Sequence, residues 1–238
     1  MSLRRCMVSS ADLQAAELVV TDASVLTYLG KSLRLRPGQE LEFFDGLGGA
    51  RRGQLKRIEQ RLLRGEWLEP FRQEPRLGPS GPIPILARLK GGDEEEAVAA
   101  LASLGLPEIR LFQAEREPYG RTGPGKQAFR WQRISDDSCR QSGAYWRTEI
   151  RWFSSLSDAL CGLDTLVFGD ASGVAVGSQD CDRLGVVIGP EGGLTDLEQQ
   201  LLLARGARAV CLGTRVLRAR HAASLLPAAI LALEGACQ

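Results

Sequence analysis

The chain has 238 residues, of which 44% are hydrophobic and 25% are charged, and its formal net charge is +1. This composition excludes wholesale disorder and a chain that is basic throughout, and the length allows one large domain or two smaller ones. The six cysteines form no C-x-x-C pair, no leader pattern opens the chain, and no apolar run reaches the roughly 18 residues that span a bilayer. We therefore expect no metal site, no membrane segment and a cytoplasmic location with reduced cysteines.

Residues 1–74 are predicted to form a small β-rich domain. Short runs of strand-forming residues alternate there with turn residues, and these runs are Leu18–Thr21, Leu41–Phe44, Gly53–Ile58 and Gly65–Leu68. The dipeptide Asp45-Gly46 indicates a tight turn between two of them. Residues 74–84 are dense in proline and glycine, which is typical of a linker, so we place the domain boundary there.

Residues 82–238 are predicted to form an α/β domain, because strands and helices alternate along this part of the chain. The expected strands are Ile85–Leu89, Glu108–Phe112, Glu149–Phe153, Thr165–Phe168, Leu184–Ile188 and Ala209–Leu212. Helical spacing of apolar residues occurs before Gly105, around Trp131, between the last two strands and after the last strand. This order predicts a mostly parallel sheet covered on both faces, with a ligand site beyond the carboxyl ends of its strands.

The segment Ile188-Gly-Pro-Glu-Gly-Gly193 connects a buried strand to a helix. Thr195 and Glu198 have the spacing of a capping box, which predicts the start of that helix. The glycines permit positive φ and leave the backbone open, so that its amide and carbonyl groups can bind a ligand. Taken alone, such a turn is more often only a tight turn than a binding site.

A second strand-end glycine, Gly213, lies in the segment Leu212-Gly-Thr-Arg-Val-Leu-Arg218. Two glycine loops that are close in the sequence can face the same ligand. Arg215 and Arg218 precede the last helix rather than lie along its exposed face, which favours a functional position. Ordinary surface charge is the alternative interpretation for both.

Two basic stretches are candidates for RNA contact. Residues 204–220 contain five arginines and no carboxylate, and a looser cluster runs from Arg110 to Arg140. Solvated helix faces are the alternative for either stretch. Gly120–Gln127 matches part of a phosphate-binding loop, but Gln127 replaces the Ser or Thr that would hold magnesium, so a basic RNA-facing loop is the better interpretation.

Ile188–Thr195 with Glu198, taken together with Leu212–Arg218, resembles the RsmE family of the SPOUT superfamily, the ribosomal RNA (uridine-N3) methyltransferases. Further matches lie at Leu33-Arg34, Pro37-Gly38, Phe44–Gly46, Lys90-Gly91, Leu104-Gly105, Glu115-Arg116, Arg130-Trp131 with Ile134, and Gln141-Ser142. The resemblance implies a PUA-like β-barrel in residues 1–74 and an α/β trefoil-knot (SPOUT) domain in residues 82–238. It also implies a homodimer that uses S-adenosylmethionine to methylate N3 of a uridine in 16S rRNA of the small ribosomal subunit.

The resemblance assigns roles to individual residues as well. The main-chain groups that it places around S-adenosylmethionine belong to Ile188, Gly189, Glu191, Gly192, Gly193, Leu212, Gly213 and Leu217. Arg218 becomes the candidate cation near O2 or O4 of the uracil, where it would stabilise negative charge, and Arg215 the candidate contact to phosphate. The residues expected to bind RNA are Arg34, Arg116, Arg121, Lys126 and Arg220.

The chain also departs from the family pattern. The usual L-R-x-E-T-A reads Leu217-Arg-Ala-Arg-His-Ala222, so Arg220 and His221 stand where the family has glutamate and threonine. His221 is either a base at neutral pH or a structural or RNA-facing substitution. Two alternative functions stay open: a divergent member that binds rRNA, with or without cofactor, and does not methylate it, and a knotted methyltransferase for another RNA.

Overall fold

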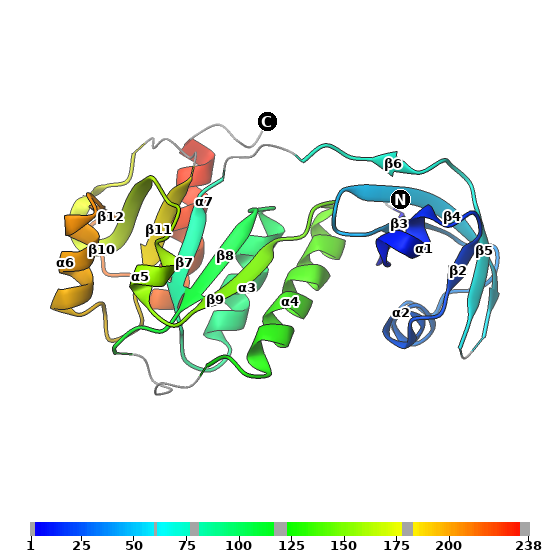
Figure 1. Ribbon diagram of the computed structural model, residues 1–238, viewed down its shortest axis with the longest axis horizontal. Coiled ribbons are helices and arrows are strands. Elements are labelled where there is room, and N and C mark those ends of the chain that lie inside the picture. Colours follow the sequence, from blue (N-terminus) through cyan, green and yellow to red (C-terminus); the bar gives the residue numbers. More distant parts are fainter. Residues whose placement is uncertain (1–2, 60, 77–80, 117–122, 178–182, 234–238) are drawn as a thin grey trace. The chain divides into compact units, whose positions relative to one another are not determined.

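The computed structural model describes residues 3–59, 61–76, 81–116, 123–177 and 183–233. The chain forms two compact units (Figure 1). The first comprises Met1–Leu77 together with Cys139–Arg147, and the second comprises Gly78–Ser138 and Thr148–Gln238. The first unit therefore contains a stretch, Cys139–Arg147, that the alternation of strands and helices grouped with the second. No helix among the described residues combines the length and the apolar character needed to cross a membrane.

The first unit is built on a mixed sheet with the strand order β1-β3-β4-β5-β2, to which β6 adds by pairing with β4. The strands are β1 (Arg4–Met7), β2 (Leu18–Val20), β3 (Glu40–Phe44), β4 (Gly49–Ile58), β5 (Leu63–Trp67) and β6 (Arg72–Gln73). β1 pairs with β3 in parallel, and the other pairs are antiparallel. Two short helices, α1 (Ser10–Gln14) and α2 (Ala23–Thr27), and a π-helix at Tyr28–Ser32 complete the unit.

The predicted turn at Asp45 connects β3 to β4. Its carboxylate Oδ1 accepts hydrogen bonds from the backbone N–H groups of Leu47 (2.8 Å) and Gly49 (2.9 Å). Such side-chain-to-backbone bonds are the reason that aspartate favours turns. The sequence prediction of a tight turn is therefore confirmed at this position.

The stretch Cys139–Arg147 completes the core of the first unit. Cys139 is buried together with Phe44 and Ala50. The guanidinium of Arg5 donates to the carbonyl oxygens of Cys139 (3.1 Å) and Ala144 (3.0 Å). Apolar burial and hydrogen bonds from the Arg5 side chain to backbone carbonyls thus fix this stretch against β1 and the β3–β4 hairpin.

The second unit contains a six-stranded sheet with the order β12-β10-β11-β7-β8-β9. All the pairs in this sheet are parallel. The strands are β7 (Ile83–Ala87), β8 (Glu108–Phe112), β9 (Glu149–Phe153), β10 (Thr165–Ala175), β11 (Leu184–Ile188) and β12 (Arg208–Cys211). The predicted parallel α/β sheet is confirmed, and β10 is longer than the expected Thr165–Phe168 because its pairing with β12 continues past an irregularity between Gly169 and Val174.

Helices cover both faces of this sheet, and two hydrophobic clusters fill the space beneath them. The helices are α3 (Asp93–Ser103), α4 (Gln127–Ser142), α5 (Leu156–Ala159), α6 (Asp196–Ala204) and α7 (Ala219–Leu233). One cluster joins the sheet to α3, α4 and α7, and the other joins it to α5 and α6. Because both faces are buried, β11 carries buried residues at all five positions rather than an alternating pattern.

Candidate functional site

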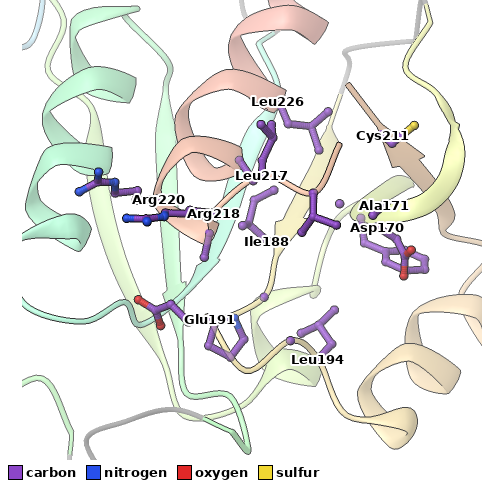
Figure 2. Close-up of a pocket in the computed structure, with 18 of the residues that line it drawn as sticks. Asp170, Ala171, Ile188, Glu191, Leu194, Cys211, Leu217, Arg218, Arg220 and Leu226 are labelled. Carbon is purple, nitrogen blue, oxygen red and sulfur yellow. The ribbon is translucent and has the colours of Figure 1, made fainter. Parts of the chain in front are cut away.

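A cavity of about 730 Å³ opens in the second unit where β11 and β12 end and β10 becomes irregular (Figure 2). Three segments, 168–171, 188–194 and 210–222, line most of it, and Lys90, Asp93, Gln199 and Leu226 complete the wall. This volume falls in the range of about 300–1,000 Å³ that is usual for small-molecule sites. The position at the carboxyl ends of parallel strands is where α/β sheets bind ligands.

The first wall is the glycine-rich segment after β11. A Cβ atom at Gly189 would lie 3.0 Å from Cγ and 3.1 Å from the backbone nitrogen of Leu194, so a side chain there would be crowded unless Leu194 shifted. Gly193 has φ +72°, which favours glycine. The predicted capping box is confirmed, because Thr195 N–H donates to the Glu198 carboxylate (2.8 Å) and Glu198 N–H donates to the Thr195 hydroxyl (3.3 Å).

Contacts from neighbouring loops hold this segment in place. The carboxylate of Glu191 accepts a hydrogen bond from the backbone N–H of Lys90 (3.0 Å), in the loop after β7. Arg116, in the loop after β8, donates to the carbonyl oxygen of Gly192 (3.4 Å). The backbone that faces the cavity is therefore fixed from two sides, which reduces the entropy that a ligand must remove on binding.

The second wall is the segment between β12 and α7, which brings three arginines to the cavity: Arg215, Arg218 and Arg220. Arg218 and Arg220 lie on the same side as Glu191 in Figure 2. Arg220 also forms an ion pair with Asp93 (3.4 Å), which stands at the start of α3.

His221 is not among the residues that line the cavity. Its Nε2 atom accepts a hydrogen bond from the guanidinium of Arg220 (3.4 Å). The position gives no support to His221 as a base acting on a ligand in the cavity.

A buried polar cluster supports the Lys90 and Asp93 side of the cavity. Glu94 is 3% exposed, and its carboxylate accepts hydrogen bonds from the indole N–H of Trp131 (2.8 Å) and from Arg88 (3.3 Å). Burial raises the pKa of the Glu94 carboxyl. These bonds satisfy a buried acid and fix the first turn of α3.

The third wall is the segment Phe168–Ala171 on β10, which the sequence analysis did not identify. Asp170 faces the cavity and accepts hydrogen bonds from the hydroxyl and the backbone N–H of Ser172, both at 2.7 Å. These bonds lower the pKa of the Asp170 carboxyl, the hydroxyl having the larger effect. The signal that could have found this wall is Gly169, which directly follows the apolar run Leu166–Phe168 as a glycine follows the strand in the other two loops.

The structure brings most of the predicted residues to one place. The predicted cofactor and catalytic residues that line the cavity are Ile188, Gly189, Glu191, Gly193, Leu212, Leu217, Arg215 and Arg218. Gly192 and Gly213 belong to the same loops without lining it.

The residues predicted to bind RNA are more dispersed. Arg220 lines the cavity, and Arg116 is exposed beside Gly192. Lys126 is exposed just before α4, and Arg34 is exposed in the first unit. Arg121 lies outside the described residues.

Comparison with known proteins places this chain among the RNA methyltransferases. The sequence matches the RNA methyltransferase domain family over residues 83–231 and the RNA methyltransferase PUA domain over residues 20–64. The chain belongs to this RNA methyltransferase family. The resemblance to the RsmE family, and the fold class that it implies, are thereby confirmed.

Individual relatives agree with this assignment. The ribosomal RNA small subunit methyltransferase E of Synechocystis is 29% identical over 249 residues, covering 96% of this chain and 77% of its own. The same-named enzyme of Neisseria gonorrhoeae, solved with S-adenosyl methionine, is 24% identical with a TM-score of 0.82, and 98% of each chain is covered. The methyltransferase Lpg2936 of Legionella pneumophila, solved with bound SAM, is 22% identical with a TM-score of 0.83 and the same coverage. These two structures share the fold of this chain.

Proposed function

We propose that the protein transfers a methyl group from S-adenosylmethionine to N3 of a uridine in 16S rRNA of the small ribosomal subunit. The observation that carries this proposal is the cavity, in which two glycine-containing loops and two predicted arginines converge. The names of the relatives support the substrate, since the Synechocystis protein is called a small subunit rRNA methyltransferase. A ribosomal substrate also supports a location in the cytoplasm.

The cavity fits S-adenosylmethionine in size and in chemistry. Apolar side chains of Ile188, Leu194 and Leu226 can pack against an adenine ring, and open backbone at Gly189 and Gly193 can bind its polar edge. Cationic and anionic side chains at the Glu191 side match an amino acid that carries both charges. Bound there, the cofactor supplies a methyl group on a sulfonium.

The arginines account for the activation of the uracil. N3 must lose its proton before it can accept a methyl group, and the negative charge then spreads to O2 and O4. Arg218 at the cavity can stabilise that charge, while Arg215 can bind a neighbouring phosphate. Holding donor and acceptor in one site supplies much of the remaining acceleration. Arg34, Arg116, Arg121 and Lys126 are proposed to contact the RNA backbone.

A homodimer is supported by α7, which exposes large apolar side chains beside its buried face. Leu226 and Ile230 are buried in the core, whereas Leu225 and Leu233 are each 50% exposed. Large apolar side chains that stay exposed close together on a surface often mark a contact with another chain. A second copy of this chain is the proposed cover for Leu225 and Leu233.

Methyl transfer to small subunits tests the activity. Subunits and free 16S rRNA from a strain that lacks this enzyme are incubated with labelled S-adenosylmethionine, and the product is located by mass mapping. Label at N3 of one uridine supports the proposal. Binding of rRNA and cofactor without label would instead support a non-methylating family member, the alternative that the Arg220-His221 replacement motivates. Label only in another RNA would support a knotted methyltransferase for that RNA.

Light scattering after size exclusion tests the dimer. The chain mass is 25.8 kDa, so a dimer is expected at twice this value. Leu225→Glu is expected to give the monomer mass. Leu203→Glu is the matched control, because Leu203 is also exposed but lies on α6. A wild-type protein that runs as a monomer at all concentrations contradicts the proposal.

A further inference from the structure

Asp170 is one of three acidic residues that line the cavity, and its carboxylate keeps one oxygen atom available for a ligand. Asp93 is paired with Arg220, and Glu191 accepts from the backbone of Lys90. Asp170 uses only Oδ1, which binds the backbone and hydroxyl of Ser172. Within the described parts of the chain, its Oδ2 accepts no hydrogen bond and the side chain forms no ion pair.

The cavity has two chemically different ends. Figure 2 shows Glu191, Arg218 and Arg220 on one side of Ile188, and Asp170 on the opposite side. The first end carries both signs of charge, which suits the ammonium and carboxylate of a methionine moiety. Asp170 at the other end carries negative charge alone, so it suits neutral hydrogen-bond donors and disfavours anions.

We infer that Asp170 is a cofactor-binding and specificity-determining residue, whose Oδ2 atom accepts hydrogen bonds from the ribose hydroxyls of S-adenosylmethionine and whose charge excludes nucleotides phosphorylated on that ribose. The inference rests on the proposed function, since it assumes that this cofactor occupies the cavity. A carboxylate is well matched to hydroxyl donors, because a hydrogen bond to a charged acceptor is stronger than one to a neutral acceptor.

The side chain is prepared for this role by its surroundings. The two bonds from Ser172 fix the orientation of the carboxylate, so little side-chain entropy is lost on binding. The same bonds hold its pKa below the ordinary value, which keeps it anionic at neutral pH.

Calorimetric titration of purified protein tests the inference without an activity assay. The probes are S-adenosylhomocysteine, 5′-methylthioadenosine, which lacks the amino acid, and the pair adenosine and 2′,3′-dideoxyadenosine. Asp170→Ala is expected to lower the affinity for S-adenosylhomocysteine and the affinity for methylthioadenosine by the same factor, about tenfold to a hundredfold. The preference for adenosine over its dideoxy analogue is expected to shrink by a similar factor, and Asp170→Asn is expected to lie between.

Asp164→Ala is the matched control, because Asp164 directly precedes β10 but lies away from the cavity, where it pairs with Arg183. It is expected to leave all affinities unchanged. Unchanged affinities in Asp170→Ala would overturn the inference, as would a loss confined to S-adenosylhomocysteine, which assigns the contact to the ammonium. A wild-type protein that binds neither S-adenosylhomocysteine nor methylthioadenosine overturns the proposed function itself. Thermal unfolding of each variant separates loss of binding from loss of folding.

Discussion

A guanidinium nitrogen of Arg220 lies 3.4 Å from the Oδ1 atom of Asp93, so that the first turn of α7 is joined to the first residue of α3 at the edge of the cavity. Both side chains are about one third exposed, at 35% and 33%. Ion pairs with this exposure contribute no more than about 1 kcal/mol to folding. Arg220 therefore already has a partner. An RNA phosphate would have to share the Arg220 guanidinium with Asp93 or displace the Asp93 carboxylate.

This competition predicts opposite effects of two substitutions on RNA affinity. Arg220→Ala is expected to weaken binding of an rRNA fragment and to lower the slope of its salt dependence by about one. Asp93→Ala is expected to strengthen binding, because it leaves the arginine unpaired, while Glu96→Ala removes an exposed acid from the same turn and serves as control. Fluorescence titrations at several salt concentrations measure both, and an Arg220→Ala affinity equal to the wild type would remove this residue from the RNA contacts.

The backbone of the cofactor loop gives a second prediction. Gly193→Ala is expected to lower the free energy of unfolding by about 1–2 kcal/mol, because φ +72° is unfavourable for a residue with a Cβ atom. Asparagine tolerates this conformation better, so Gly193→Asn is expected to lower the free energy of unfolding by less than Gly193→Ala does. Urea unfolding measures the loss of stability in each variant, and calorimetry with S-adenosylhomocysteine measures its cofactor affinity. Equal stability of the alanine and asparagine variants would contradict the argument from conformation.

Glu198 connects the start of α6 to a second loop. Besides its capping bonds to Thr195, its carboxylate accepts a hydrogen bond from the backbone N–H of Glu115 (3.1 Å). Glu198→Ala is therefore expected to cost about 1–3 kcal/mol of unfolding free energy. Asp196→Ala, which removes an exposed acid from the same turn, is expected to cost under about 1 kcal/mol. Denaturant unfolding of both variants measures the two losses of unfolding free energy. Equal losses would show that the hydrogen bonds of Glu198 add nothing to stability.

Glu42 in the first unit predicts a pH dependence. Burial acts to raise the pKa of its carboxyl, but hydrogen bonds from Tyr145, Arg5 and Arg72 outweigh burial and leave the pKa below its ordinary value. A depressed pKa means that Glu42 stabilises the fold above the unfolded-state value of about 4.3, and that this stabilisation is lost as the pH falls through the folded-state pKa.

Glu42→Gln is accordingly expected to cost on the order of 2 kcal/mol at pH 7, and progressively less as the pH falls below about 4.3. Glu40→Gln on the same strand is the control, since the Glu40 side chain is 40% exposed. Urea unfolding followed by circular dichroism at several pH values gives the comparison. If the difference in unfolding free energy between Glu42→Gln and the wild type stayed constant across this pH range, the depressed pKa of Glu42 would not be its cause.

The two arginines of the cavity are expected to affect different kinetic constants. Arg218→Ala is expected to lower kcat by on the order of 10²-fold while the affinity for S-adenosylhomocysteine is retained, because its charge acts on the uracil. Arg215→Ala is expected mainly to raise KM for RNA. Steady-state methyl transfer on small subunits distinguishes them, and an unchanged kcat in Arg218→Ala would assign the charge stabilisation to another group.

The sequence predicted the elements of the parallel sheet most accurately. β8, β9 and β11 begin and end at the predicted residues, since each is a short run bounded by clear breaks in the pattern. The start of α6 was equally clear, because a capping box is local chemistry between Thr195 and Glu198. Such features depend on neighbours in the sequence, so a single sequence contains the information.

Features that depend on distant contacts were missed. β1 was not predicted, because Arg4–Met7 has no strand pattern of its own and gains its structure from parallel pairing with β3. Asp170 was missed because the glycine before it marks only a strand end, and the irregular pairing of β10 with β12 sets where this strand faces the cavity. The association of Cys139–Arg147 with the first unit likewise depends on contacts with residues almost a hundred positions earlier.

That last association affects the order in which the protein can fold during its synthesis. The ribosome delivers the chain from the N-terminus, and domains generally fold as they emerge. Phe44 and Ala50 cannot complete their packing before Cys139 has been synthesised. The N-terminal unit therefore reaches its final packing only after β7, α3, β8 and most of α4 have been made. A nascent chain that stops at the interdomain linker is expected to expose part of its core, and the first unit to close only when its late-synthesised segment has left the exit tunnel.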